Sequence, residues 1–164
     1  MKIKSNSFLI CLIAFFAIHN FVFCQQKQFT IEKHFDALNK HNITDLQNLF
    51  SEDAKIESTG FDSIKIGGAG VKEIYSRYFK SSPDLKYKII NIIYSDNDAV
   101  VEYFSTGTMV NVEDKFSEFM KGKVYTLKNC TIFKFKGDKI IKSSTYFDQL
   151  SFLRQMKYFD QKNK

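Results

Sequence analysis

Apolar side chains recur every three or four residues near the start of the domain, a spacing that places them on one face of a helix. Ile31, Phe35 and Leu38 form such a stripe and predict a helix over residues 28–40. A capping-box pattern then begins at Thr44, which predicts the start of a short second helix. This helix is expected to carry three apolar side chains inward: Leu46, Leu49 and Phe50.

Glycine and proline divide the middle of the chain. Short strands are predicted over residues 54–58 and 63–66, on either side of a turn at Gly60. The run Gly67–Gly70 is predicted to be a loop that leads into a third helix, and Pro83 ends that segment. The apolar stripe of the third helix consists of Val71, Ile74, Tyr75, Tyr78 and Phe79.

The second half of the chain reads as a series of long strands. They are predicted over residues 85–94, 99–110, 124–136 and 139–148, with a tight hairpin turn at Gly137-Asp138. Residues 149–158 are predicted to form a short closing helix. Because the helices come first and a meander of antiparallel strands follows, the fold class is α+β; parallel strands would alternate with helices.

The first 24 residues differ from the rest. Lys2 and Lys4 precede the apolar run 8–18, and Val22 and Cys24 stand before a polar stretch. This layout is typical of a signal peptide, cleaved after Cys24, and predicts a secreted or periplasmic protein. The apolar run would rise only about 16 Å as a helix, against roughly 30 Å for a bilayer core, so no stable membrane span is expected.

Two other interpretations of the leader stay open. An uncleaved membrane anchor is one, although the apolar run is short for it. The other is a bacterial lipoprotein anchored at Cys24, although the bulky Phe23 stands where a small residue is expected.

Charge and cysteine content limit the kinds of partner and of stabilising bond that are expected for residues 25–164. The formal charge of +6 falls to +4 without the two leader lysines, and the remaining lysines are scattered. Nucleic-acid binding would want a clustered basic patch with stacking aromatics, so no such partner is expected. Cys130 is the sole cysteine after the leader, so the domain has no internal disulfide and must rely on its core.

Four stretches of the chain, taken in order, resemble the SnoaL-like family of the nuclear transport factor 2-like superfamily. Together they cover about residues 28–158, and the closing hairpin is the most specific of them. They are the helical opening from Phe35 and Asn39 to Asp53-Ala54; Gly70 and its helix up to Ser82-Pro83-Asp84-Leu85; Val100-Val101-Glu102 with Gly107-Thr108; and Cys130–Phe135, Gly137–Ile140 and Tyr146-Phe147-Asp148.

The resemblance implies a cone-shaped, strongly curved antiparallel sheet wrapped around N-terminal helices, the cystatin-like or nuclear transport factor 2-like fold. Such a cone encloses an apolar pocket for a small molecule. Relatives include polyketide cyclases, ketosteroid isomerase and epoxide hydrolases beside proteins that only bind, so the fold does not fix the function. Relatives commonly pair through the open sheet face, so a homodimer is expected.

Asp148 is the sharpest candidate for chemistry. Ser144, Tyr146 and Asp148 share one face of the last strand, because strand side chains alternate. If that face lines the pocket, desolvation would raise the pKa of the Asp148 carboxyl and suit it to move a proton, with Tyr146 as a hydrogen-bond donor. In SnoaL-like cyclases the matching carboxylate plays this acid/base part. The alternatives are that Asp148 caps the final helix and that Tyr146 simply packs.

Four further residues are predicted to line the pocket: Glu102, Phe104, Met109 and Ser144. For Glu102 a solvent-facing position is the alternative. Met109 stands where many SnoaL-like proteins have a histidine, which weakens any mechanism that needs an imidazole. Ser144 replaces a large aromatic residue, which widens the cavity.

No cofactor is expected, and no metal, because His34 and His41 have no partner at ligand spacing. Two functions therefore remain. One is a cofactor-free acid/base isomerase, cyclase or hydrolase that uses Asp148. The other is a non-catalytic protein that binds or carries a small apolar ligand.

Overall fold

The computed structural model describes residues 26–112 and 115–160, so the predicted leader lies outside it. The described chain begins in a helix over residues 26–40, close to the prediction. The later helices are α2 (Ile43–Leu49), α3 (Gly67–Ser81), a 3-10 turn at Lys115–Met120, and α4 (Gln149–Gln155). The strands are β1 (Phe50–Ser58), β2 (Lys65–Ile66), β3 (Lys86–Tyr94), β4 (Asp98–Thr108), β5 (Val124–Lys136) and β6 (Lys139–Phe147). No helix in the described ranges has both the length and the apolar character needed to cross a bilayer.

All six strands form one curved sheet in the order β2-β1-β6-β5-β4-β3. Its neighbours are antiparallel except for β1 and β6, which run parallel. The α+β prediction is thus confirmed, but the expectation of a wholly antiparallel sheet is wrong at this pair. Strands β3 to β6 follow one another as antiparallel neighbours, whereas the chain passes through α3 and four strands between β1 and β6, so no hairpin dictates the direction of that pair.

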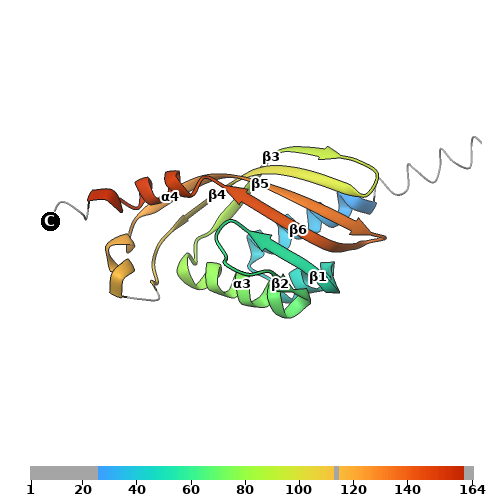
Figure 1. Ribbon diagram of the computed structural model, residues 1–164, viewed down its shortest axis with the longest axis horizontal. Coiled ribbons are helices and arrows are strands. Elements are labelled where there is room, and N and C mark those ends of the chain that lie inside the picture. The colour runs from blue at the N-terminus through green and yellow to red at the C-terminus, as the bar shows by residue number, and fades with distance from the viewer. Residues whose placement is uncertain (1–25, 113–114, 161–164) are drawn as a thin grey trace, which may run out of the picture.

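The helices pack on one face of the sheet. Figure 1 shows the N-terminal helix and α3 on the same side, with the sheet curving over them. Ile31 and Leu38 of the N-terminal helix and Phe133 of β5 are at most 2 % exposed. We call this the concave face, and the opposite one the convex face. Burial of these side chains supplies the hydrophobic free energy that holds the two layers together.

Polar side chains fix the N-terminal helix to the edge of the sheet. Lys27 donates from Nζ to the carbonyls of Ser95 and Asp96, at 2.6 Å each. At the other end of the helix, Asn39 pairs with both backbone groups of Tyr87: its Nδ2 donates to the carbonyl at 2.9 Å, and its Oδ1 accepts from the amide at 2.8 Å. Asn39 therefore acts as a further hydrogen-bonding partner for edge strand β3 and fixes the position of Tyr87.

Helix α2 starts two residues earlier than predicted. Asn42, not Thr44, is its N-cap, and the Asn42 Oδ1 accepts from the Asp45 amide at 3.1 Å. Asparagine is among the strongest N-caps, so it outcompetes the capping box read from Thr44. The helix buries Leu46 as expected, but Phe50 already belongs to β1.

The glycine run is the first turn of α3 and not a loop, which corrects the prediction. Gly67 has φ +57°, and a Cβ there would lie 2.2 Å from the Glu52 carbonyl oxygen. A Cβ on Gly70 would lie 2.7 Å from that of Lys65. The glycines are thus needed because the helix begins directly against β1 and β2.

Two motifs far apart in sequence meet at the end of β4. The Asp84 carboxylate accepts from the Thr108 amide at 2.8 Å and from its hydroxyl at 2.7 Å. These hydrogen bonds lower the pKa of Asp84. Gly107 lets the two segments approach, because a Cβ there would lie 3.1 Å from the Ser82 Cβ.

His34 lies inside the core. It is 2 % exposed, its ring packs on Phe50, Tyr75 and Phe133, and its Nδ1 has no hydrogen-bond partner. Desolvation lowers its pKa from 6.5 to about 3. His34 is therefore neutral in the folded protein at every ordinary pH.

We predict that this histidine makes the fold acid-sensitive. Below pH 6.5 the unfolded chain binds a proton at His34 that the folded chain does not, so the free energy of unfolding should fall by up to about 1.4 kcal/mol per pH unit. Urea titrations between pH 6.5 and 5.5 measure this slope, above the ordinary pKa values of Glu57 and Asp84, whose lowered folded pKa values affect stability only at lower pH. His34→Leu should flatten it; an unchanged slope would show that another group is responsible.

Candidate functional site

A cavity of about 330 Å³ lies between α3 and the concave face of β4, β5 and β6. Its wall includes Ile74 and Tyr78 of α3, Leu127 of β5 and Phe147 of β6. None of the lining residues comes from the N-terminal helix, which covers the other end of the concave face. The volume falls at the lower end of the range for small-molecule sites.

Tyrosines dominate the wall. Five of the eight in the sequence line the cavity: Tyr75, Tyr78, Tyr87, Tyr103 and Tyr125. Burial raises the pKa of each, to about 12 for Tyr78. All five phenols are therefore protonated at neutral pH and serve as hydrogen-bond donors.

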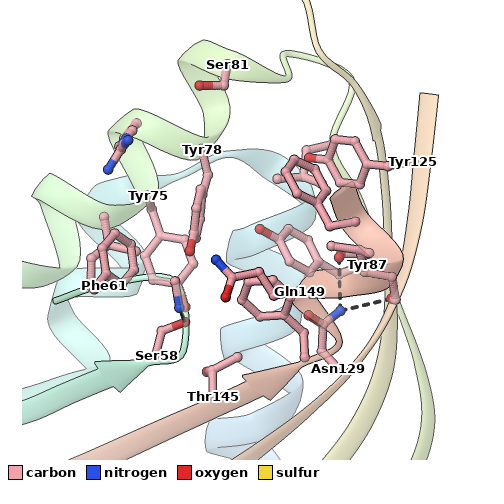
Figure 2. A pocket seen from close by; sticks show the side chains of 18 of the residues that line it. Ser58, Phe61, Tyr75, Tyr78, Ser81, Tyr87, Tyr125, Asn129, Thr145 and Gln149 are labelled. Carbon is pink, nitrogen blue, oxygen red and sulfur yellow. Dashed lines mark hydrogen bonds between the residues drawn. The ribbon is translucent and has the colours of Figure 1, made fainter. Parts of the chain in front are cut away.

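Some of these hydroxyls are already used within the protein. Tyr125 donates to the Ser82 hydroxyl at 3.1 Å, and Tyr103 bonds the Thr131 hydroxyl at 3.1 Å. The hydroxyls of Tyr75 and Tyr87 bond no described residue. Figure 2 shows the Tyr87 ring extending from the sheet into the hollow, toward the α3 tyrosines. Its hydroxyl is thus available to a ligand.

A polar group interrupts the apolar wall on β5. Asn129 is 7 % exposed and lines the cavity. Its Nδ2 donates to the Ser105 hydroxyl at 2.9 Å and to the Leu127 carbonyl at 3.0 Å, as the dashed lines in Figure 2 show. No described residue donates to its Oδ1. The side chain is thus held firmly, with one acceptor unused.

Glu57 is the one carboxylate among the described lining residues, and it is already engaged. It forms an ion pair with Lys142 at 3.0 Å and accepts from the Ser144 hydroxyl at 3.0 Å. Both contacts lower its pKa. Glu57 is therefore a weak base, because its lowered pKa lies further from neutral pH than the pKa that suits a proton-transfer residue.

The histidines do not join the cavity. His34 lies in the core, and His41 stacks on Phe79 with its Nε2 2.8 Å from the Leu85 carbonyl. Among residues 26–112 and 115–160, no three histidine, cysteine or acidic side chains gather as a metal site would require.

Tyr146 and Asp148 do not line the cavity. Tyr146 is 50 % exposed, and Asp148 is the N-cap of α4, where its Oδ1 accepts from the Ser151 amide at 2.9 Å. The capping alternative is thus confirmed. The catalytic role of the pair stays a prediction, without support from the cavity geometry.

A β-bulge explains why the predicted face was wrong. Phe135 pairs with Ile140, but the next residue, Lys134, pairs with Lys142, so Ile141 is an extra residue in β6. A one-residue insertion turns every later side chain to the other face. Thr145 and Phe147 consequently face the cavity. Ser144, Tyr146 and Asp148, which were predicted to line it, do not.

The other predicted residues also separate. Glu102 pairs with Lys128 at 3.2 Å, and Phe104 is 40 % exposed; both lie on the convex side of β4, because Tyr103 and Ser105 point into the cavity. Ser144 is buried against Glu57 and is not at the wall. Met109 does line the cavity, and its sulfur accepts from the Ser82 hydroxyl at 3.7 Å.

Most residues of the wall were missed from sequence, and two of the polar ones differ in the signal they carry. The signal for Asn129 is present: it is a polar residue in the inward series of β5, whose neighbours include Tyr125, Leu127 and Phe133. Gln149, the first residue of α4, carried no signal. In Figure 2 its carboxamide reaches between the α3 tyrosines and Asn129.

Comparison with known proteins gives a family and a fold. The sequence pattern described as a SnoaL-like domain matches residues 31–143. No curated protein matches the chain.

Solved structures resemble the chain at low sequence identity. A Catenulispora acidiphila protein with a ketosteroid isomerase-like fold, in complex with trimethylamine, has a TM-score of 0.66 at 14 % identity and covers 78 % of this chain and 92 % of its own. IdmH of Streptomyces antibioticus, a candidate polyketide cyclase, has a TM-score of 0.69 at 18 % sequence identity, and the match covers 80 % of this chain and 99 % of IdmH. An LEH-like epoxide hydrolase of M. tuberculosis has a TM-score of 0.65 at 16 % sequence identity, and the match covers 82 % of this chain and 91 % of the hydrolase. At such identities the likeness establishes the fold alone.

We predict that Asp148 acts on stability through its cap. Asp148→Ala should cost about 1 kcal/mol of unfolding free energy, whereas Asp148→Asn should cost little, because asparagine caps equally well. Urea denaturation of the two variants measures the difference. Equal losses in both would contradict a role limited to capping.

Proposed function

The chain belongs to the SnoaL-like domain family, and we propose that it binds a small, planar, largely apolar molecule without transforming it. The observation that carries this proposal is the tyrosine-lined cavity. Among its described lining residues, no acid or base has a pKa shifted toward neutrality.

The form of the wall supports a planar ligand. Tyr75 and Tyr78 project from α3, and Tyr87 and Tyr103 from the facing strands, so aromatic rings border the space from two sides. Aromatic rings prefer offset stacks or edge-to-face contacts with other rings, each worth about 0.5–1.5 kcal/mol beyond burial. A molecule of roughly two or three fused rings suits this volume.

The protonation states support binding over catalysis. Phenols with raised pKa values donate hydrogen bonds but do not release protons near pH 7, and Glu57 is held ionised by Lys142. An isomerase or cyclase needs a group that both takes and returns a proton. Related folds do include a candidate polyketide cyclase and an epoxide hydrolase. For Asp148 to serve here, however, it would have to leave its cap and cross to the concave face.

We also propose that the mature domain works outside the cytoplasm as a homodimer. The leader pattern, with its basic start and short apolar run, supports export. Large exposed side chains on the convex face support self-association: Ile93 is 60 %, Phe104 40 % and Tyr146 50 % exposed.

Tyrosine fluorescence offers a direct test of binding, because the sequence has no tryptophan and most tyrosines line the cavity. Titration with 2-acetylnaphthalene should quench the emission to saturation. Ser105→Phe should weaken the affinity at least about tenfold, because the new ring occupies the cavity; tenfold corresponds to roughly 1.4 kcal/mol.

The neighbouring residue provides the matched control. Thr106→Phe adds the same ring to the exposed, convex side of β4 and should leave the titration unchanged. Circular dichroism checks that both variants fold. Absence of saturable quenching in the unmodified protein, or full quenching in Ser105→Phe, would refute the binding role.

Export and pairing can be tested on one sample. Full-length protein expressed in a bacterium should appear in the exported fraction, with the mass of a chain that begins at Gln25. Light scattering should give twice that mass. A mass that retains Cys24 with added lipid would support the lipoprotein alternative, and a single-chain mass in scattering would exclude the dimer.

A further inference from the structure

We propose that the Asn129 Oδ1 atom selects ligands that carry an N–H or O–H donor on the edge facing β5. The inference rests on the proposed binding role and goes further by specifying a polar group that the ligand must have. Asn129 is 7 % exposed, so a group that pairs with it is almost wholly removed from water.

The orientation of the Asn129 carboxamide follows from its neighbours. The Leu127 carbonyl, 3.0 Å away, can only accept a hydrogen bond, so the atom facing it must be the nitrogen. The second N–H of the same nitrogen donates to the Ser105 hydroxyl at 2.9 Å. Both donors are thus used, and the oxygen is the atom left for the cavity.

The Asn129 Oδ1 atom is an unused acceptor in a wall whose other free polar groups include tyrosine hydroxyls, which donate. Tyr87 is the cross-strand partner of Ser105, and the Ser105 hydroxyl accepts from Asn129, so the free phenol and the free carboxamide oxygen belong to the same part of the wall. Figure 2 shows both side chains at the same wall. A ligand edge that carries a donor beside an acceptor, as in an amide or lactam, would satisfy both groups.

The energetic reason for selection is the cost of an unpaired buried carbonyl. A ligand donor restores the hydrogen bond that Oδ1 loses when it is taken out of water, whereas a methyl group covers the oxygen and offers no hydrogen bond. The penalty therefore falls on the wrong ligand, as in sites built around a substrate N–H or O–H.

A matched pair of probes isolates this interaction. 2-Naphthamide and 2-acetylnaphthalene have the same ring and carbonyl and differ by an NH₂ group in place of a CH₃ group. We expect the full mature chain to bind the amide about tenfold more tightly, the value of one net hydrogen bond. Isothermal titration calorimetry gives both dissociation constants, and their ratio is the readout.

Two variants assign the preference to its residue. Asn129→Leu removes the acceptor and should bring the ratio close to one. Asn91→Leu makes the same change at an exposed position of β3 and should keep the ratio of the unmodified protein. Each ratio compares two ligands on the same variant, so a general loss of stability does not change the ratio. Each variant is titrated under conditions in which circular dichroism shows it to be folded.

Each outcome decides the question. A tenfold ratio that disappears only in Asn129→Leu supports the inference. Equal binding of the two probes, or a ratio that survives in Asn129→Leu, overturns the inference and leaves the binding role intact. Failure of both probes to bind the unmodified protein overturns the binding role and the inference with it.

Discussion

The concave face of the sheet is longer than the helix that fills it, and the site depends on this mismatch. Strand β5 has 13 residues, which at about 3.3 Å each extend roughly 43 Å. The N-terminal helix, residues 26–40, rises about 22 Å at 1.5 Å per residue. It covers Phe133 and Phe135 at one end of the strand and leaves Tyr125, Leu127 and Asn129 to face a hollow.

The hollow stays open because its borders are fixed by polar contacts. Asn39 holds Tyr87 by both backbone groups, and Asp84 ties the segment after α3 to Thr108 at the end of β4. Side chains large enough to collapse inward, chiefly the tyrosines, are thus anchored at their backbones. The motifs that carry the family resemblance largely consist of residues that make these structural hydrogen bonds. This explains why the motifs indicate a fold more clearly than a reaction.

Sequence was a good guide wherever one local pattern decided the outcome. The bounds of β5 were predicted to the residue, because its alternation is long and a glycine turn follows it. Local patterns failed where distant backbone mattered. The glycine run belongs to a helix because it must approach Glu52. At α2 the choice lay between two local signals, and the N-cap Asn42 won over the capping box that starts at Thr44. The site was harder still: alternation shows which residues share a face, but the extra residue at Ile141 decides which face turns inward.

That extra residue has an evolutionary consequence. Ile141 corresponds to a single codon, and its in-frame loss would restore regular pairing from Phe135 onward. Every later residue of β6 would keep its partner on β5, so Thr145 and Phe147 would still face the hollow and Tyr146 would stay on the convex face. A lineage could thus gain or lose the bulge, and with it the local bend and extra twist of β6, without changing which residues form the wall of the cavity.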